Sequence, residues 1–320
     1  MASASSIVPT TAEVATDPTF RSYTPAQAAT YAAHRISYAS AIYKLILEHH
    51  AQSGGEFGLL LDVGCGPGNA TRDLAASFER VIGCDAGEAM IETARDLGGK
   101  TKSHGEVEFY VSPAEALSGV KGLCEDGEGK VDMLTVAAAA HWFNMDKFWA
   151  EAAKVLKPGG TLAIWTRASG FPDPNQPNAQ KLREIILRFQ DETIAKYELP
   201  GNRLARGTYE NLPLPWQASP PVLSLPEANF VKHDFDRGGV LSNGKTFFGG
   251  SRRLTLEQIE KAIGTASPVT RWREANPDLA GTEKDCVKTL VADLREALNG
   301  KEELIEGPAT TILLFKRTSC

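Results

Sequence analysis

The order of apolar and polar residues predicts an α/β fold for the first half of the chain. Short apolar runs that suit buried parallel strands lie at 59–62, 81–85, 107–111, 131–137 and 161–165. Amphipathic stretches separate them, such as 146–156, where apolar side chains recur at helical spacing. Strands that alternate with helices predict a parallel, doubly wound sheet with right-handed crossovers.

The pattern changes after residue 165. A long amphipathic stretch at 182–194 and a proline-rich segment at 199–226 come first, and Thr255 with Gln258 then predicts a helix-capping box. An apolar strand returns at 310–316 and is expected to form the reversed edge of the sheet. We therefore expect a lid inserted over the carboxyl edge of the sheet, where such insertions shape an acceptor pocket.

The predicted domain organisation has four parts. The first residues are rich in Ser, Thr and Ala, which suggests a disordered arm, and a helical pattern from 23 to 50 then precedes the first strand. The expected parts are an arm at 1–22, a core with an N-terminal helical closure at 23–165, a lid at 166–305 and a last core strand at 306–320.

The turn after the first apolar run carries three alternate glycines, Gly64, Gly66 and Gly68. Glycine turns tightly and lets a ligand lie against the main chain without a Cβ in the way. The next strand ends in Asp85, placed to accept hydrogen bonds from two ribose hydroxyls. The third glycine of the dinucleotide fingerprint is replaced by Asn69, and the loop lacks a triphosphate-binding signature. This strand-loop-helix-strand unit therefore predicts a site for a nucleoside ligand that is neither a dinucleotide nor a nucleoside triphosphate.

Composition and charge narrow the class of partner. The chain has 320 residues and a net charge of −6, without a basic run of the kind that binds nucleic acid or membranes. No apolar stretch reaches the length of a membrane helix, and the first residues do not read as a secretion signal. Five cysteines without a C-x-x-C pair suggest free thiols and no zinc site. We expect a cytoplasmic protein with a small-molecule partner.

Two segments around the glycine loop resemble a known family. LLDVGCGPG and VIGCDAGEAMIETAR resemble the first and second motifs of class I S-adenosylmethionine (SAM) methyltransferases, and KPGGTLAIW resembles their later helix-turn-strand. The segments HWF, YAAHRISY, GTYENLPLPW and RWREANP resemble the trans-aconitate methyltransferase-like branch. The resemblance implies a mostly parallel seven-stranded sheet with a helical lid, SAM as cofactor, and methyl transfer to a small-molecule acceptor.

The resemblance also implies which residues hold SAM. Asp62 and Gly64 would hold its methionine end, and Tyr31 and Arg35, on one face of the N-terminal helix, would close over it, with Arg35 pairing with its carboxylate. Asp85 would bind the ribose. The other residues expected around the cofactor are Gly66, Gly68, Ala86, Met90, Ala114, Glu115 and Ala138.

Methyl transfer from a sulfonium is an in-line displacement, so the enzyme must orient the two reactants and exclude water. A general base is needed only if the acceptor holds a proton at neutral pH, and a carboxylate does not. His141, after the fourth strand, is the candidate base for a hydroxyl or thiol acceptor, or else a histidine packed at a strand end. Trp142 is expected to wall the pocket.

Acidic acceptors need positive partners, and arginine suits planar carboxylates. The lid contains Arg203, Arg206, Arg252, Arg253 and Arg271. The residues expected to bind the acceptor are Trp165, Arg203, Arg206, Tyr209 and Trp216. Three hypotheses stay open: a carboxyl methyltransferase, a natural-product O- or S-methyltransferase with His141 as base, and a SAM-binding regulator without turnover.

Overall fold

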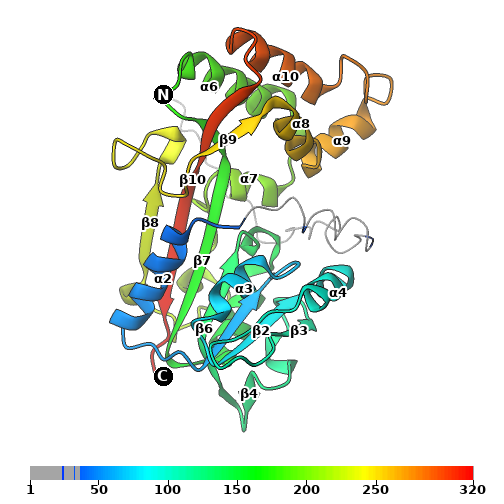
Figure 1. Ribbon diagram of the computed structural model, residues 1–320. Coiled ribbons are helices and arrows are strands. Elements are labelled where there is room, and N and C mark those ends of the chain that lie inside the picture. The colour runs from blue at the N-terminus through cyan, green and yellow to red at the C-terminus, as the bar shows by residue number, and fades with distance from the viewer. Residues whose placement is uncertain (1–23, 25–31, 33–36, 320) are drawn as a thin grey trace, which may run out of the picture.

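The computed structural model describes residues 24, 32 and 37–319 (Figure 1). Its central sheet has eight strands among the described residues, one more than the seven expected: seven follow the order β3-β2-β1-β6-β7-β10-β8, and β9 (Arg252–Thr255) pairs with β10 outside this order. The first five of these strands pair in parallel, whereas β10 is antiparallel to both β7 and β8. In the order of the sheet, the strands are Glu108–Val111, Arg80–Asp85, Leu59–Val63, Val131–Ala137, Leu156–Pro172, Glu303–Lys316 and Val231–Phe235. The predicted mostly parallel, doubly wound sheet is confirmed.

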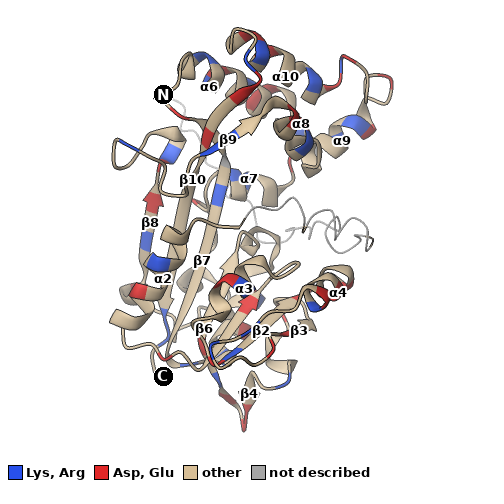
Figure 2. Ribbon diagram, viewed as in Figure 1, with Lys and Arg blue, Asp and Glu red and all other residues tan. Residues whose placement is uncertain are grey.

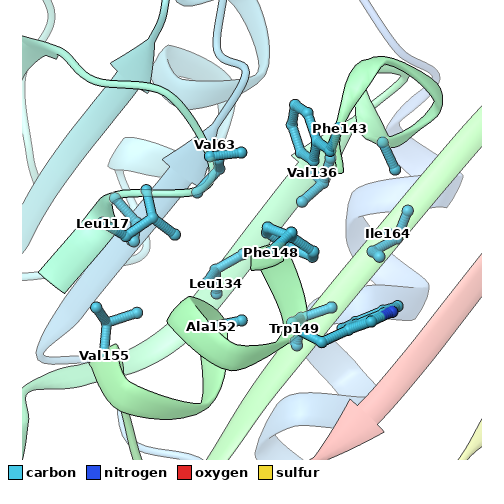
Figure 3. Close-up of a cluster of buried hydrophobic side chains, with 14 of the residues drawn as sticks. Val63, Leu117, Leu134, Val136, Phe143, Phe148, Trp149, Ala152, Val155 and Ile164 are labelled. Carbon is cyan, nitrogen blue, oxygen red and sulfur yellow. The ribbon is translucent and has the colours of Figure 1, made fainter. Parts of the chain in front are cut away.

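Helices cover both faces of the sheet because its central strands are apolar on both sides. One face carries α2 (Ser40–Gln52), α3 (Asn69–Ala75) and α4 (Glu88–Leu97), and the other carries α5 (Met145–Val155). Figure 3 shows Phe148 and Trp149 of α5 lying against Leu134 and Ile164 of the sheet. This packing holds the carboxyl ends of β1, β2 and β6 at one edge.

Two of the predicted strands are longer than the sequence pattern suggested. β7 continues from 165 to Pro172, and β10 begins at Glu303, so the two strands pair far beyond the end of β6. The expectation that the last strand forms the edge is wrong, because β8 lies outside β10. The sequence did not predict β8 because the strand has only five residues, VKHDF. Its three central residues are polar, and none of the five is buried.

The extended strands carry the lid (Figure 1). Its elements are β9 (Arg252–Thr255), α6 (Ala179–Arg188), α7 (Pro200–Arg206), α8 (Leu256–Gly264), α9 (Ser267–Ala275) and α10 (Cys286–Ala297). Leu182, Val269 and Val287 belong to a hydrophobic core within this region. The predicted capping box is present: the Thr255 hydroxyl oxygen accepts from the backbone N–H of Gln258, and Gln258 Oε1 accepts from the backbone N–H of Thr255.

Smaller features complete the picture. Residues 122–130, between β3 and β6, contain the short hairpin of β4 (Cys124–Glu125) and β5 (Glu128–Gly129). Within the described part of the chain, no helix is long and apolar enough to cross a membrane. The proposed arm at 1–22, together with Tyr31 and Arg35, lies outside the described residues.

Candidate active site

The glycine loop joins β1 to α3 at the carboxyl edge of the sheet. The backbone N–H groups of Gly64 and Cys65 both donate to the Cys84 carbonyl, at 2.8 and 3.0 Å, which binds the loop to the end of β2. A Cβ added at Gly64 would lie 2.5 Å from the Ala139 Cβ, and one at Gly68 would lie 2.9 Å from the Phe109 ring. Both glycines therefore permit close packing.

Gly66 has a different environment. Its φ is +52°, and apart from the adjacent residues no described residue has an atom within 4 Å of the position that a Cβ would take. The backbone at this point is thus open to a ligand that approaches closely, as the sequence predicted.

The Asp85 carboxylate borders this open backbone. Its Oδ2 accepts from the Gly66 N–H at 2.9 Å, and its Oδ1 accepts from the Gly87 N–H at 2.8 Å. Each carboxylate oxygen can accept more than one hydrogen bond, so the fixed group retains capacity for hydroxyl donors. Ala86 is half-buried beside it, and Met90 is buried in the first turn of α4.

Asp62 lies completely inside the protein. Its Oδ2 accepts from the Thr71 hydroxyl at 2.6 Å, and its Oδ1 accepts from the Thr135 hydroxyl at 2.8 Å. Burial raises the pKa of Asp62 to about 6, against the opposing effect of these two hydrogen bonds. Asp62 therefore joins β1, α3 and β6 beneath the loop, and its expected contact with the methionine end of a cofactor stays a prediction.

The sequence reasoning missed Thr71 and Thr135. The available signal was a polar residue inside the otherwise apolar strand 131–137, because a buried hydroxyl needs a hydrogen-bond partner.

The loops after β3 and β6 contact each other. Glu115 accepts a hydrogen bond from the Asn144 backbone N–H at 2.7 Å, next to the start of α5, while Ala114 is buried. Ala138 adopts a left-handed backbone, with φ of 51°, and its N–H donates to the Trp165 carbonyl at 2.8 Å. These contacts place Glu115 and Ala138 along the rim of the site.

His141 and Trp142 meet the lid. The Nδ1 atom of His141 is 2.9 Å from the Tyr209 hydroxyl oxygen, and its ring centroid is 4.5 Å from that of Trp142. α7 begins directly over them, because a Cβ at Gly201 would lie 2.6 Å from the His141 carbonyl oxygen and 2.8 Å from the Trp142 ring. The structure therefore brings Tyr209 to the candidate base, where the sequence had placed it only in the acceptor pocket.

Tyr209 sits in a constrained turn. Thr208 and Tyr209 both have left-handed backbones, with φ of 53° and 59°. Burial raises the pKa of the Tyr209 hydroxyl, so this group is protonated at neutral pH. Two consecutive non-glycine residues in this conformation persist only where surrounding contacts hold them, here around the hydrogen bond to His141.

Other expected acceptor residues lie elsewhere. Trp216 contacts the Phe230 ring edge-on and lies tilted to the Phe315 ring, and Phe315 pairs with Leu162, three residues before Trp165 in β7. The structure thus places Trp216, partly buried, against the hydrophobic core that contains Phe148 and Trp149 of α5. Trp165 itself is fully buried, edge-on to Tyr38 on the face of the sheet that carries α2.

The lid arginines contact other groups of the protein. Arg203 donates to the Glu198 carbonyl, and Arg206 pairs with Asp191 and with Glu198. Similar contacts exist for Arg252 with Glu306, Arg253 with Glu303, and Arg271 with the Tyr197 carbonyl and Asn202. Each of these lid arginines therefore has a partner within the protein, and the expected role of Arg203 and Arg206 toward an acceptor stays a prediction.

The structure places a different arginine near the site. Arg167 follows Trp165 by two residues, just past Ala137–Trp165, the last parallel pair between β6 and β7. Its guanidinium carbon lies 4.4 Å from the centre of the Tyr38 ring. The basic segment of β7 is visible where the strand rises above β6 (Figure 2). In the sequence, the only indication of Arg167 was that a charged residue follows the apolar segment 161–165.

Fold and loop together define a class I SAM-binding site: the topological switch beside β1, Gly66 and the Asp85 carboxylate all occur at one edge of the sheet. In the described part of the chain, no group of three or more His, Cys, Asp or Glu side chains could hold a metal ion.

Comparisons with known proteins agree with this class. A family model described as a methyltransferase domain matches residues 61–164. The Saccharomyces cerevisiae protein CRG1, named as a probable S-adenosylmethionine-dependent methyltransferase, is 30% identical over 82% of this chain and 84% of its own length. The trans-aconitate 2-methyltransferase of Streptomyces coelicolor is 35% identical over 33% of each chain.

Among solved structures, a protein assigned as a type II methyltransferase from Anaeromyxobacter dehalogenans aligns with a TM-score of 0.57 at 25% identity. The alignment covers 88% of this chain and 96% of that one. The chain belongs to the SAM-dependent methyltransferases, and SAM is its methyl donor. The hypothesis of a regulator without turnover is therefore not retained.

Proposed function

We propose that this methyltransferase acts on a small carboxylic acid and forms its methyl ester. The observation that carries the proposal is the position of Arg167, at the carboxyl edge of the sheet and over the Tyr38 ring at 4.4 Å. A guanidinium is planar by resonance, and an aromatic ring beneath it fixes the orientation of that plane, whose edge is the part that binds a carboxylate. The activity named for the Streptomyces coelicolor relative, on trans-aconitate, supports an acidic acceptor.

The residues of the loop fit SAM. Gly66 has room for a ligand against its backbone, and the Asp85 carboxylate beside it is held for hydroxyl donors. Bound SAM supplies a methyl group on a positively charged sulfur. The chain contributes orientation of the acceptor and exclusion of water, with α7 closing over the loop after β6. A carboxylate is already ionised at neutral pH, so no residue has to remove a proton.

A second candidate function rests on His141. The Tyr209 hydroxyl at 2.9 Å from Nδ1 fixes the orientation of the imidazole, as the orienting partner of a general base does. This arrangement favours methyl transfer to a hydroxyl or thiol, with His141 taking the proton.

The two functions separate in an acceptor screen with labelled SAM. We expect transfer to trans-aconitate or benzoate, and Arg167→Gln should raise the KM for the acid about 10- to 100-fold, the effect of losing a charge-assisted hydrogen bond. The Kd of SAM should stay within about twofold, since the ribose and loop contacts do not involve Arg167.

Arg203→Gln is the matched control, because Arg203 is an exposed lid arginine bonded to a carbonyl. Transfer to phenols or thiols but not to acids would replace the first function with the second. Equal KM values in both arginine variants would remove the role of Arg167.

A further inference from the structure

The free edge of the central sheet is formed by β8, the five-residue strand Val231–Phe235. Among the described strands it pairs only with β10, so its second edge is left without a strand partner in this part of the chain. Such an edge presents backbone N–H and C=O groups that can pair with another strand. The side chains along it decide which strand fits.

β8 has two side chains of opposite charge, one on each side of its central residue, His233. Lys232 and Asp234 flank His233, point to the same face of the strand, and are 3.0 Å apart between Nζ and Oδ2. The Thr311 hydroxyl also donates to Asp234, which holds the carboxylate in place. In an antiparallel pairing of two copies centred on His233, Lys232 of each copy faces Asp234 of the other. A shift of the register by one residue would lose both pairs.

Exposed apolar side chains flank the same strand. Val231 is 36% exposed, Leu223 is 83% exposed and Val240 is 73% exposed, and only two other large apolar residues of the described chain are exposed. Leu223 lies toward the Val231 end, since its neighbour Ser224 accepts from the N–H of Thr318, just past the end of β10. Val240 follows the turn after β8.

A twofold axis through His233 brings the beginning of one strand beside the end of the other. Leu223 of one copy would then approach Val240 of the second copy, and Val231 would face Phe235. We propose that two copies of this chain associate through β8, with the two sheets joined into one. A five-residue pairing is smaller than the roughly 800 Å² per partner of a standard interface, so the flanking apolar segments must contribute and the dimer is of micromolar strength.

Lysine on an edge strand commonly prevents pairing. Here the same Lys232 becomes favourable, because the twofold pairing sets an aspartate opposite it. Cross-strand pairs of opposite charge stabilise a sheet, and like charges directly opposite destabilise it. Association therefore depends on a pattern that charge reversal can break and restore.

The experiment is sedimentation of the full chain at about 1–100 µM, the range of a weak dimer. The natural chain should dimerise, and K232E and D234K should each weaken association at least tenfold, because each variant replaces two attractive pairs with two repulsive ones. K261E, which reverses a charge of an exposed pair on α8, is the matched control and should dimerise normally.

The decisive experiment is sedimentation of a mixture of the two single variants, K232E and D234K. Glu at 232 of one variant then faces Lys at 234 of the other, and Asp234 of the first faces Lys232 of the second, so the mixture should form heterodimers. The double variant K232E/D234K should also recover dimers. A natural chain that is monomeric at about 100 µM would overturn the proposal. So would single variants that dimerise normally, or a mixture that stays monomeric. Methyl transfer plays no part in the readout.

Discussion

Asp62 makes the stability of this protein depend on pH in a way that a single substitution can isolate. The carboxyl is completely buried, and burial raises its pKa from 3.8 to about 6. Between these two values the folded state binds more protons than the unfolded state. The free energy of unfolding therefore falls as pH rises through this window.

The magnitude follows from the shift. About two pKa units correspond to about 3 kcal/mol of stability, fully present below the unfolded-state pKa of 3.8 and lost by pH 7. Asp62→Asn removes the titration and keeps the shape of the side chain, and its amide can still hydrogen-bond with the hydroxyls of Thr71 and Thr135.

The assay is urea unfolding of the natural chain and of Asp62→Asn at pH steps from about 3 to 8. The difference in unfolding free energy between the two proteins should shift by about 3 kcal/mol in favour of the variant, with its midpoint between the two pKa values. Other titrating groups cancel in this difference. A difference that does not change with pH would refute the reasoning that burial dominates at this carboxyl. Thr135→Val is a useful second variant, since loss of one hydrogen bond should enlarge the pH dependence of the natural aspartate.

Three further predictions concern the site. Asp85→Ala should weaken SAM binding at least tenfold, about 1.4 kcal/mol, in calorimetry, and unchanged binding would remove Asp85 from the cofactor site. His141→Ala should barely change transfer to a carboxylate but should slow transfer to a hydroxyl or thiol by about 10²-fold; equal losses in kcat would indicate a structural role. Tyr209→Phe should cost about 1 kcal/mol in thermal unfolding, the value of one hydrogen bond, and should alter the pH profile of kcat only if His141 is the base.

The geometry of the glycine loop and of Asp85 was predictable because it depends on residues that are close together in the sequence. Gly66 and Asp85 lie 19 residues apart in one strand-loop-helix-strand unit, so spacing along the chain translates directly into geometry. The periodicity of the strands and of α5 likewise reflects neighbours in sequence. Glu115 was expected at the cofactor, but its hydrogen bond to Asn144 shows that it also joins two loops.

The acceptor side was not predictable in this way. Arg203 and Arg206 have the right chemistry, but Glu198 and Asp191, a few positions earlier, engage them within the lid. Charge and residue type can identify a possible ligand for a carboxylate, whereas the partner that an arginine selects depends on how the lid folds.

By itself, the sequence determined the α/β architecture, the glycine loop and the position of the Asp85 carboxylate beside that loop, because short-range spacing and apolar periodicity dictate them. Only the tertiary structure decided that Tyr209 reaches His141 across 68 residues, that Arg167 lies over the Tyr38 ring, and that β8 forms the edge of the sheet. Those contacts depend on strand register and on the path of the lid, which join residues far apart in the chain and leave no local pattern.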